Sequence, residues 1–183
     1  SWFAVIGSGP NDYWGNGIKQ QAHVYVIDLA SGDLKRDFTT NAGIGKSSPF
    51  FTSSGAIDMK SNYNVDAVYL TETFRETDLV NNTEKKKGAL HRIIVPWESS
   101  DFDPTDNPED YGVIDGQYND NPDSWTFGKI YASEQPIVSP PGLSYDSERN
   151  AWVFFGTGIL NEHEDKEDLS TQYLIGLKDP YFN

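Results

Sequence analysis

His23-Val24-Tyr25-Val26-Ile27-Asp28-Leu29 runs directly into the turn Asp28-Leu29-Ala30-Ser31-Gly32. A run of β-branched and aromatic residues favours an extended strand. Asp28 followed four residues later by glycine is typical of a tight turn, because glycine accepts a positive φ at little cost. Similar short runs, bounded by Gly, Asn, Asp, Ser and Pro, recur at Trp2–Ile6, Pro49–Ile57, Ala67–Leu70, Ala89–Val95, Phe127–Tyr131, Trp152–Phe155 and Tyr173–Leu177. With no window of helical periodicity, the sequence predicts an all-β fold.

The composition excludes several classes of function. The 183 residues include 14 Lys and Arg against 28 Asp and Glu, a formal net charge of −14. Nucleic acids and anionic membranes both favour a basic partner surface, so neither is an expected partner. No apolar run approaches the length of a membrane-spanning helix. The absence of cysteine excludes disulfides, thiolate catalysis and zinc–thiolate sites.

Two long polar segments interrupt the strand pattern, and we interpret both as insertions. Phe74–Gly88 is polar and contains Lys85-Lys86-Lys87, and Glu98–Ser124 holds nine acidic residues without Lys or Arg. Connections of this length are usually functional or disordered. We expect the second segment to be a solvated acidic loop.

An internal echo indicates a repeat. Phe3–Gly9 and Val153–Gly158 are both strands that end in Gly-Ser/Thr-Gly. Two equivalent strands so far apart suggest propeller blades of ~40–45 residues with insertions. The chain then covers about three blades of antiparallel sheet, and because it starts in mid-strand we expect it to be part of a larger protein. The rest of that propeller, or a second chain, would cover the open strand edges.

The loop Asp58–Asp66 is the candidate metal site. Oxygen-bearing residues at positions 1, 5, 7 and 9 are spaced so that one tight loop can turn them toward a hard cation such as Ca²⁺. The candidate ligands are Asp58, Asn62, Asn64 (through its carbonyl) and Asp66. Lys60 departs from this pattern, because a cation stands where an Asp or Asn ligand is expected. The alternative is a metal-free Asn/Asp-rich hairpin turn.

The order of the motifs resembles the C-terminal β-propeller of PilY-type proteins, the type IV pilus tip adhesins and biogenesis factors. The motifs that carry the resemblance are, in order, Val24–Gly32, Ser47–Pro49, Asp58–Asp66, Val68–Tyr69, Gly88–Arg92, Gln135–Ile137, Phe155–Gly158 and Gln172–Gly176. The resemblance implies a quinoprotein-like propeller displayed at a bacterial pilus tip or on the outer surface. It also implies calcium in the Asp-rich loop at Asp58, Asn62, Asn64 and Asp66. Lys60, His91 in place of a tryptophan, and Glu72 in place of an Asp depart from the family pattern.

We therefore expect a non-enzymatic extracellular module, exported through the periplasm, that supports pilus extension and surface attachment together with pilus or minor pilin components. The alternatives are a quinoprotein-like dehydrogenase propeller and a carbohydrate-active propeller. No coherent set of catalytic or cofactor-binding residues favours the dehydrogenase. Exposed aromatics and plentiful carboxylates are compatible with carbohydrate binding.

Overall fold

The computed structural model describes residues 1–9, 21–40, 46–61, 63–96, 121–160 and 163–182. In these residues the fold is all-β, as predicted, with three antiparallel sheets and no α-helix. The first sheet holds β1 (Phe3–Gly7), β2 (Ala22–Asp28) and β3 (Leu34–Thr40). The middle sheet holds β4 (Lys46–Ile57), β5 (Ala67–Asp78), β6 (Thr83–Ile94) and β7 (Thr126–Ser133), and the last sheet β8 (Gly142–Tyr145), β9 (Ala151–Gly156) and β10 (Leu174–Lys178). Two short 3-10 helices, η2 (Pro122–Ser124) and η3 (Glu164–Glu167), complete the described elements.

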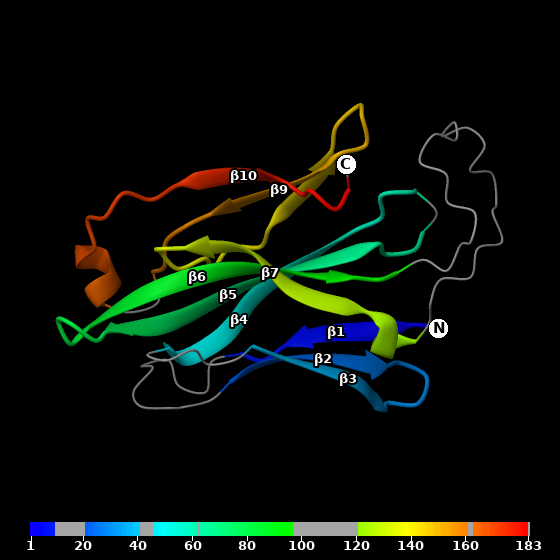
Figure 1. Ribbon diagram of the computed structural model, residues 1–183, viewed down its shortest axis with the longest axis horizontal. Helices are drawn as coiled ribbons and strands as arrows, with labels where there is room; N and C mark the ends of the chain where they lie inside the picture. Colours follow the sequence, from blue (N-terminus) through cyan, green and yellow to red (C-terminus); the bar gives the residue numbers. More distant parts are fainter. Residues whose placement is uncertain (10–20, 41–45, 62, 97–120, 161–162, 183) are drawn as a thin grey trace.

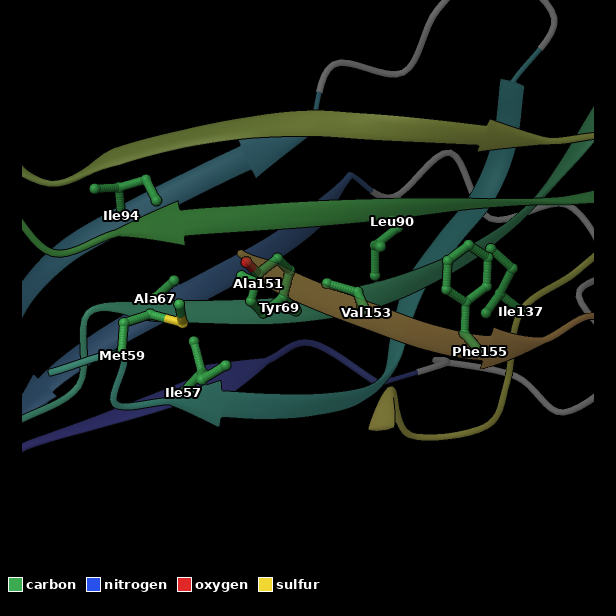
Figure 2. Packing of buried hydrophobic residues seen from close by; sticks show 10 residues of the cluster. All are labelled: Ile57, Met59, Ala67, Tyr69, Leu90, Ile94, Ile137, Ala151, Val153 and Phe155. Carbon is green, nitrogen blue, oxygen red and sulfur yellow. The ribbon is translucent and has the colours of Figure 1, made fainter. Parts of the chain in front are cut away.

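The three sheets lie in three layers, and each consists of strands that follow one another in sequence (Figure 1). The middle sheet is covered on both faces. Val24, Val26 and Phe38 of the first sheet pack against one face, where they meet Leu70 and Ile93. On the other face, residues of the middle sheet (Ile57, Ala67, Tyr69, Leu90 and Ile94) form a second cluster with Ala151, Val153 and Phe155 of the last sheet (Figure 2). The apolar core is therefore divided between two interfaces, and none of the described sheets closes into a barrel.

Two strands and one hairpin differ from the sequence-based expectation. The strands β3 and β8 were not predicted. The segment Phe74–Gly88 was interpreted as a long polar insertion between strands, and that interpretation is wrong. Its residues continue β5 and β6 in an unbroken antiparallel register from Ala67↔Ile94 to Asp78↔Thr83. Most of the acidic segment Glu98–Ser124 lies outside the described residues, and its last residues form η2.

The two Gly-Ser/Thr-Gly motifs have the same backbone geometry. In the first sheet the Ser8 N–H donates to the His23 carbonyl oxygen at 2.7 Å, and the Ser8 hydroxyl accepts from the His23 N–H at 2.9 Å. In the last sheet the Thr157 N–H donates to the Tyr173 carbonyl oxygen at 2.9 Å, and the Thr157 hydroxyl accepts from the Tyr173 N–H at 2.8 Å. The pair β1–β2 is thus locally equivalent to β9–β10.

Gly88 marks a close approach between the middle sheet and the segment after β7. A Cβ atom at Gly88 would lie 2.8 Å from both the Gln135 carbonyl oxygen and the Ile137 nitrogen, which are backbone atoms that cannot move aside cheaply. We expect Gly88→Ala to lower the free energy of unfolding by about 2 kcal/mol through overpacking. Gly128→Ala is the matched control in the neighbouring strand β7, since a Cβ there meets nothing within 4 Å. Urea denaturation of both variants measures the difference, and equal stabilities would contradict the close packing at Gly88.

Candidate functional site

The loop Asp58–Asp66 joins β4 to β5 and folds around its own two carboxylates. Asp58 accepts hydrogen bonds from the backbone N–H of Lys60 at 3.1 Å and of Tyr63 at 2.7 Å. Asp66 is 4% exposed and accepts from the Met59 N–H at 2.7 Å. Ser61 and Tyr63 both have positive φ, which lets the chain turn tightly enough for these contacts. The described part of the loop is therefore a compact turn stabilised by the side chains of Asp58 and Asp66.

Lys60 supplies a positive charge inside this loop. Its Nζ lies 3.4 Å from Oδ1 of Asp66, which forms an ion pair on the inner side of the loop. Burial lowers the pKa of Lys60, and the neighbouring Asp66 and Asp58 oppose that shift. Burial raises the pKa of Asp66, while Lys60 and the Met59 N–H act in the opposite direction. The ammonium group thus partly neutralises both carboxylates.

In the described part of the loop, the Lys60 ammonium takes a carboxylate oxygen of Asp66 that a calcium ion would use. Of the four predicted ligands, Asn62 lies outside the described residues, and the Asn64 residue is exposed. The structure brings Asp58 and Asp66 together around Lys60, but oxygens of both already accept backbone hydrogen bonds. Within the described ranges, no group of three or more His, Asp or Glu side chains is placed to hold a metal. A cation at this site would have to displace the Lys60 ammonium from Asp66.

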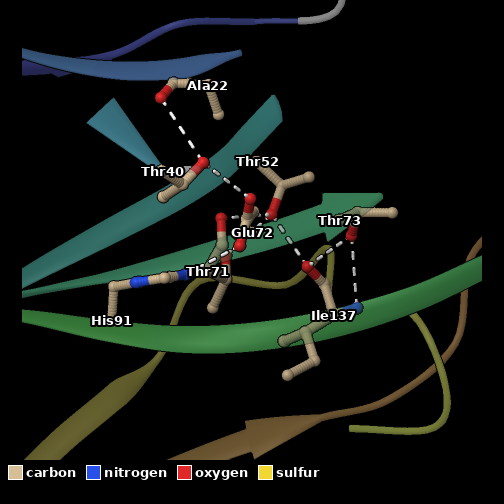
Figure 3. Close-up of polar contacts among 8 residues, drawn as sticks. All are labelled: Ala22, Thr40, Thr52, Thr71, Glu72, Thr73, His91 and Ile137. Carbon is tan, nitrogen blue, oxygen red and sulfur yellow. Dashed lines mark hydrogen bonds and ion pairs between the residues drawn. The ribbon is translucent and has the colours of Figure 1, made fainter. Parts of the chain in front are cut away.

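A second polar group lies buried between the first and middle sheets (Figure 3). Glu72 of β5 is 1% exposed and its Oε2 lies 2.7 Å from Nε2 of His91 on β6. Thr40 of β3 donates its hydroxyl proton to the other Glu72 oxygen at 3.1 Å, which connects the two sheets. The His91 ring stacks on Phe127 with centroids 5.1 Å apart. The carboxylate–imidazole pair is therefore enclosed by side chains of both sheets.

A row of threonines on the middle sheet holds the segment after β7. The hydroxyls of Thr52 and Thr73 donate to the Ile137 carbonyl oxygen at 2.8 and 3.1 Å, and the Ile137 N–H donates back to Thr73 at 3.3 Å (Figure 3). The hydroxyls of Thr52 and Thr71 lie 2.7 Å apart. Because Ile137 is fully buried, these side chains satisfy backbone groups that would otherwise be left without partners.

Asp179 anchors the C-terminal segment to the middle sheet. This carboxylate is fully buried and accepts hydrogen bonds from the Tyr69 hydroxyl at 2.7 Å and from the Tyr181 N–H at 2.9 Å. The Arg92 guanidinium pairs with the same carboxylate and lies over the Tyr181 ring, 5.1 Å from its centroid. Burial and the bond to Asp179 raise the pKa of the Tyr69 phenol, so it remains a hydrogen-bond donor at neutral pH. Nothing in the sequence pattern indicated this group.

Comparisons with protein-family models, with curated proteins and with solved structures found no match. The fold and its polar groups define an all-β protein of three stacked antiparallel sheets. No helix in the described part of the chain is long and apolar enough to cross a membrane.

Proposed function

We propose that this chain is a non-enzymatic, extracellular module of a bacterial PilY-type protein, acting in type IV pilus extension and surface attachment. The observation that carries the proposal is the stack of three consecutive antiparallel meanders, with the same Ser8 and Thr157 hydrogen-bond pattern in the first and last sheets. Propellers are built from such repeated sheets packed face to face. The order of the sequence motifs extends this likeness along nearly the whole chain.

The acid–base pair formed by Glu72 and His91 is buried, and this burial favours a binding role over catalysis. Glu72 and His91 are 1% and 5% exposed, and aromatic rings of Phe51 and Phe127 contact the imidazole. A general base must come within hydrogen-bond reach of the proton that it removes. A pair enclosed between two sheets is better suited to holding those sheets together than to contacting a substrate.

The outer face of the first sheet is the proposed contact with the rest of the propeller or with a second chain. The β1–β2 register places Ile6 beside Tyr25 on this face, and Leu34 pairs with Ile27. Ile6 is 49% exposed and Leu34 is 56% exposed. Aliphatic side chains on a sheet face are the kind that interlock with another sheet.

The role is tested in the source bacterium by deleting the coding sequence of these 183 residues from its gene. We expect fewer surface pili and weaker surface attachment, and immunogold labelling of the intact protein at pilus tips or on the outer surface. Normal piliation and attachment, or labelling confined to the cytoplasm, would contradict the proposal. Because the readout is the pilus itself, it does not depend on the identity of any bound ligand.

Calcium regulation is a separate part of the proposal, and it requires Lys60 to leave Asp66. We expect Lys60→Asp to bind Ca²⁺ at least about tenfold more tightly than the unaltered chain, because Ca²⁺ affinity increases with the number of charged ligands. Isothermal titration calorimetry measures this change. Lys129→Asp alters the net charge equally on the exposed surface of β7 and should leave the affinity unchanged. Equal binding by Lys60→Asp and by the double variant Asp58→Ala, Asp66→Ala would place any calcium site elsewhere.

A further inference from the structure

The outer face of the last sheet carries two aromatic rings in a setting unlike the chain's packed interfaces. Ala151, Val153 and Phe155 of β9 are buried toward the middle sheet, so the alternate residues Trp152 and Phe154 lie on the opposite face. The two rings are close to parallel, with an interplanar angle of 14° and centroids 6.2 Å apart. No described element packs against this face, which lies at the outside of the three-layer stack (Figure 1).

Glycines on both neighbouring strands leave room around Phe154. The strand register places Phe154 between Gly142 of β8 and Gly176 of β10. A Cβ atom at Gly176 would lie 2.9 Å from the Phe154 ring, so the ring occupies the space that a side chain would need. Phe154 therefore leans over β10 while remaining 43% exposed. Phe154 thus lies in an open position on the outer face, where Leu174, the next residue of β10 on the same face, is also exposed.

Trp152 is held in place by a fixed acceptor. Its indole N–H donates to the Asp146 carboxylate at 3.0 Å, and the Asn150 side chain donates to the same carboxylate at 2.9 and 3.0 Å. These bonds lower the pKa of Asp146 to about 2, so the acceptor stays ionised at neutral pH. An aromatic side chain fixed before binding loses little conformational freedom when a ligand arrives.

Polar groups border the two rings. The register places Trp152 between Ser144 and Lys178, both exposed. An apolar surface with hydrogen-bonding groups at its rim matches a ligand with one apolar face and polar groups around its edge. A hexopyranose ring has this form, since its C–H groups carry partial positive charge that the negative face of an aromatic ring attracts, and its hydroxyls project sideways.

The interfaces between sheets of this chain look different. There the facing positions are filled largely by interdigitating aliphatic side chains, such as Val24 and Val26 against Leu70 and Ile93. The outer face of the last sheet instead carries two stacked aromatic rings, with glycine on both strands beside Phe154. The face thus differs from the interfaces between the sheets in its aromatic content.

We propose that this surface, the aromatic platform formed by Trp152 and Phe154 with Gly142, Ser144, Gly176 and Lys178, binds a hexopyranose polysaccharide by stacking of the sugar rings. The proposal does not depend on the pilus role, because it rests on the geometry of the last sheet alone. It assigns Phe154 and Trp152 as stacking residues and Ser144 and Lys178 as hydrogen-bond donors to sugar hydroxyls.

The test is native affinity electrophoresis of the 183-residue chain in gels that contain hydroxyethyl cellulose, glycol chitin or soluble starch. We expect at least one polymer to retard the unaltered chain, and Phe154→Ala and Trp152→Ala each to weaken that binding at least about tenfold, as expected for loss of an aromatic stacking contact. Gly176→Val keeps both rings but fills the space under Phe154, and should weaken binding similarly. Tyr63→Ala is the control, because it removes an aromatic side chain that is 99% exposed but lies outside the platform.

Folding and competing occupants are checked in the same variants. Circular dichroism spectra and melting curves establish that each variant folds, and Trp152→Phe, which retains a ring, should keep binding within about threefold. Retardation by none of the three polymers, or equal retardation of the folded Ala variants, overturns the proposal. A dimer of the unaltered chain that Phe154→Ala converts to a monomer also overturns it, because the face would then be an interface between two copies.

Discussion

Replacing His91 with leucine is expected to lower the free energy of unfolding by about 3 kcal/mol or more. The substitution removes the Nε2 donor that lies 2.7 Å from Glu72, a carboxylate that is 1% exposed. Removing the hydrogen-bonding partner of a buried carboxylate is strongly destabilising, because the carboxylate is then left in a medium that solvates it poorly. Thr40 still donates to Glu72, but a neutral hydroxyl compensates a buried carboxylate less well than an imidazole. The ring contacts with Phe51 and Phe127 are lost as well.

A double-mutant cycle by urea denaturation measures this effect. We expect Glu72→Leu together with His91→Leu to recover most of the stability lost in His91→Leu, since an apolar pair avoids the cost of a buried charge. His23→Leu is the matched control, because His23 pairs with Asp37 at 2.9 Å on the exposed side of the first sheet. Its loss should cost about 1 kcal/mol or less. Equal costs at His91 and His23 would show that the buried pair contributes no more than a surface contact.

The strands that form the core were predictable from sequence, because their burial and their β propensity coincide. Val24 and Val26 alternate with the partly exposed Tyr25 and Ile27, which is the period-2 pattern of a strand with one buried face. Neither β3 nor β8 has such a run. In Leu34–Thr40 only Phe38 and Thr40 are buried, and its charged residues hide the pattern.

The hairpin β5–β6 shows why Phe74–Gly88 was misread as a loop. Its inner half carries apolar residues such as Leu70 and Leu90, whereas its outer half extends past the core (Figure 1). There the strands are stabilised by their backbone pairing and by cross-strand ions such as Arg75 and Glu84, at 3.3 Å. A strand without a buried face has no hydrophobic period, so composition alone makes it resemble a polar connection.

Whether a polar group could be predicted from the sequence depends on whether its contacts are local or join distant residues. The turn at Asp58 forms between residues two and five apart, and residue types at that spacing predict it. The pairs Thr40–Glu72 and Arg92–Asp179 join residues 32 and 87 apart, and they exist only because the sheets stack. Single-sequence reasoning singled out His91 and Glu72 as unusual residues, but it gave no reason to pair them.

Replacing Arg92 with leucine should cause the second large loss of stability. We expect the free energy of unfolding to fall again by about 3 kcal/mol or more. Arg92 is the cation paired with Asp179, whose side chain is fully buried, and without it the carboxylate retains the Tyr69 hydroxyl and the Tyr181 N–H. Two neutral donors do not replace a guanidinium in a region of low dielectric. Because the Asp179 N–H also donates to the Ala151 carbonyl oxygen at 2.8 Å, the loss should loosen the end of the chain against β9. Tryptic cleavage after Lys178 should therefore become faster.

Arg36→Leu provides the matched control for this prediction. Arg36 also pairs with an aspartate, Asp123 at 3.0 Å, and also lies over an aromatic ring, that of Phe38 at 5.2 Å, but the Asp123 side chain is 70% exposed. An exposed pair of this kind contributes about 1 kcal/mol or less, so the two arginine variants separate burial from pairing.

Asp179→Asn added to Arg92→Leu should recover part of the stability by removing the uncompensated charge. If Arg92→Leu and Arg36→Leu cost the same and tryptic cleavage after Lys178 is unchanged, then Arg92 does not anchor the C-terminal segment. If only the stability of Arg92→Leu falls, and Asp179→Asn fails to restore any of it, the loss comes from the contact between Arg92 and the Tyr181 ring instead of from the buried charge.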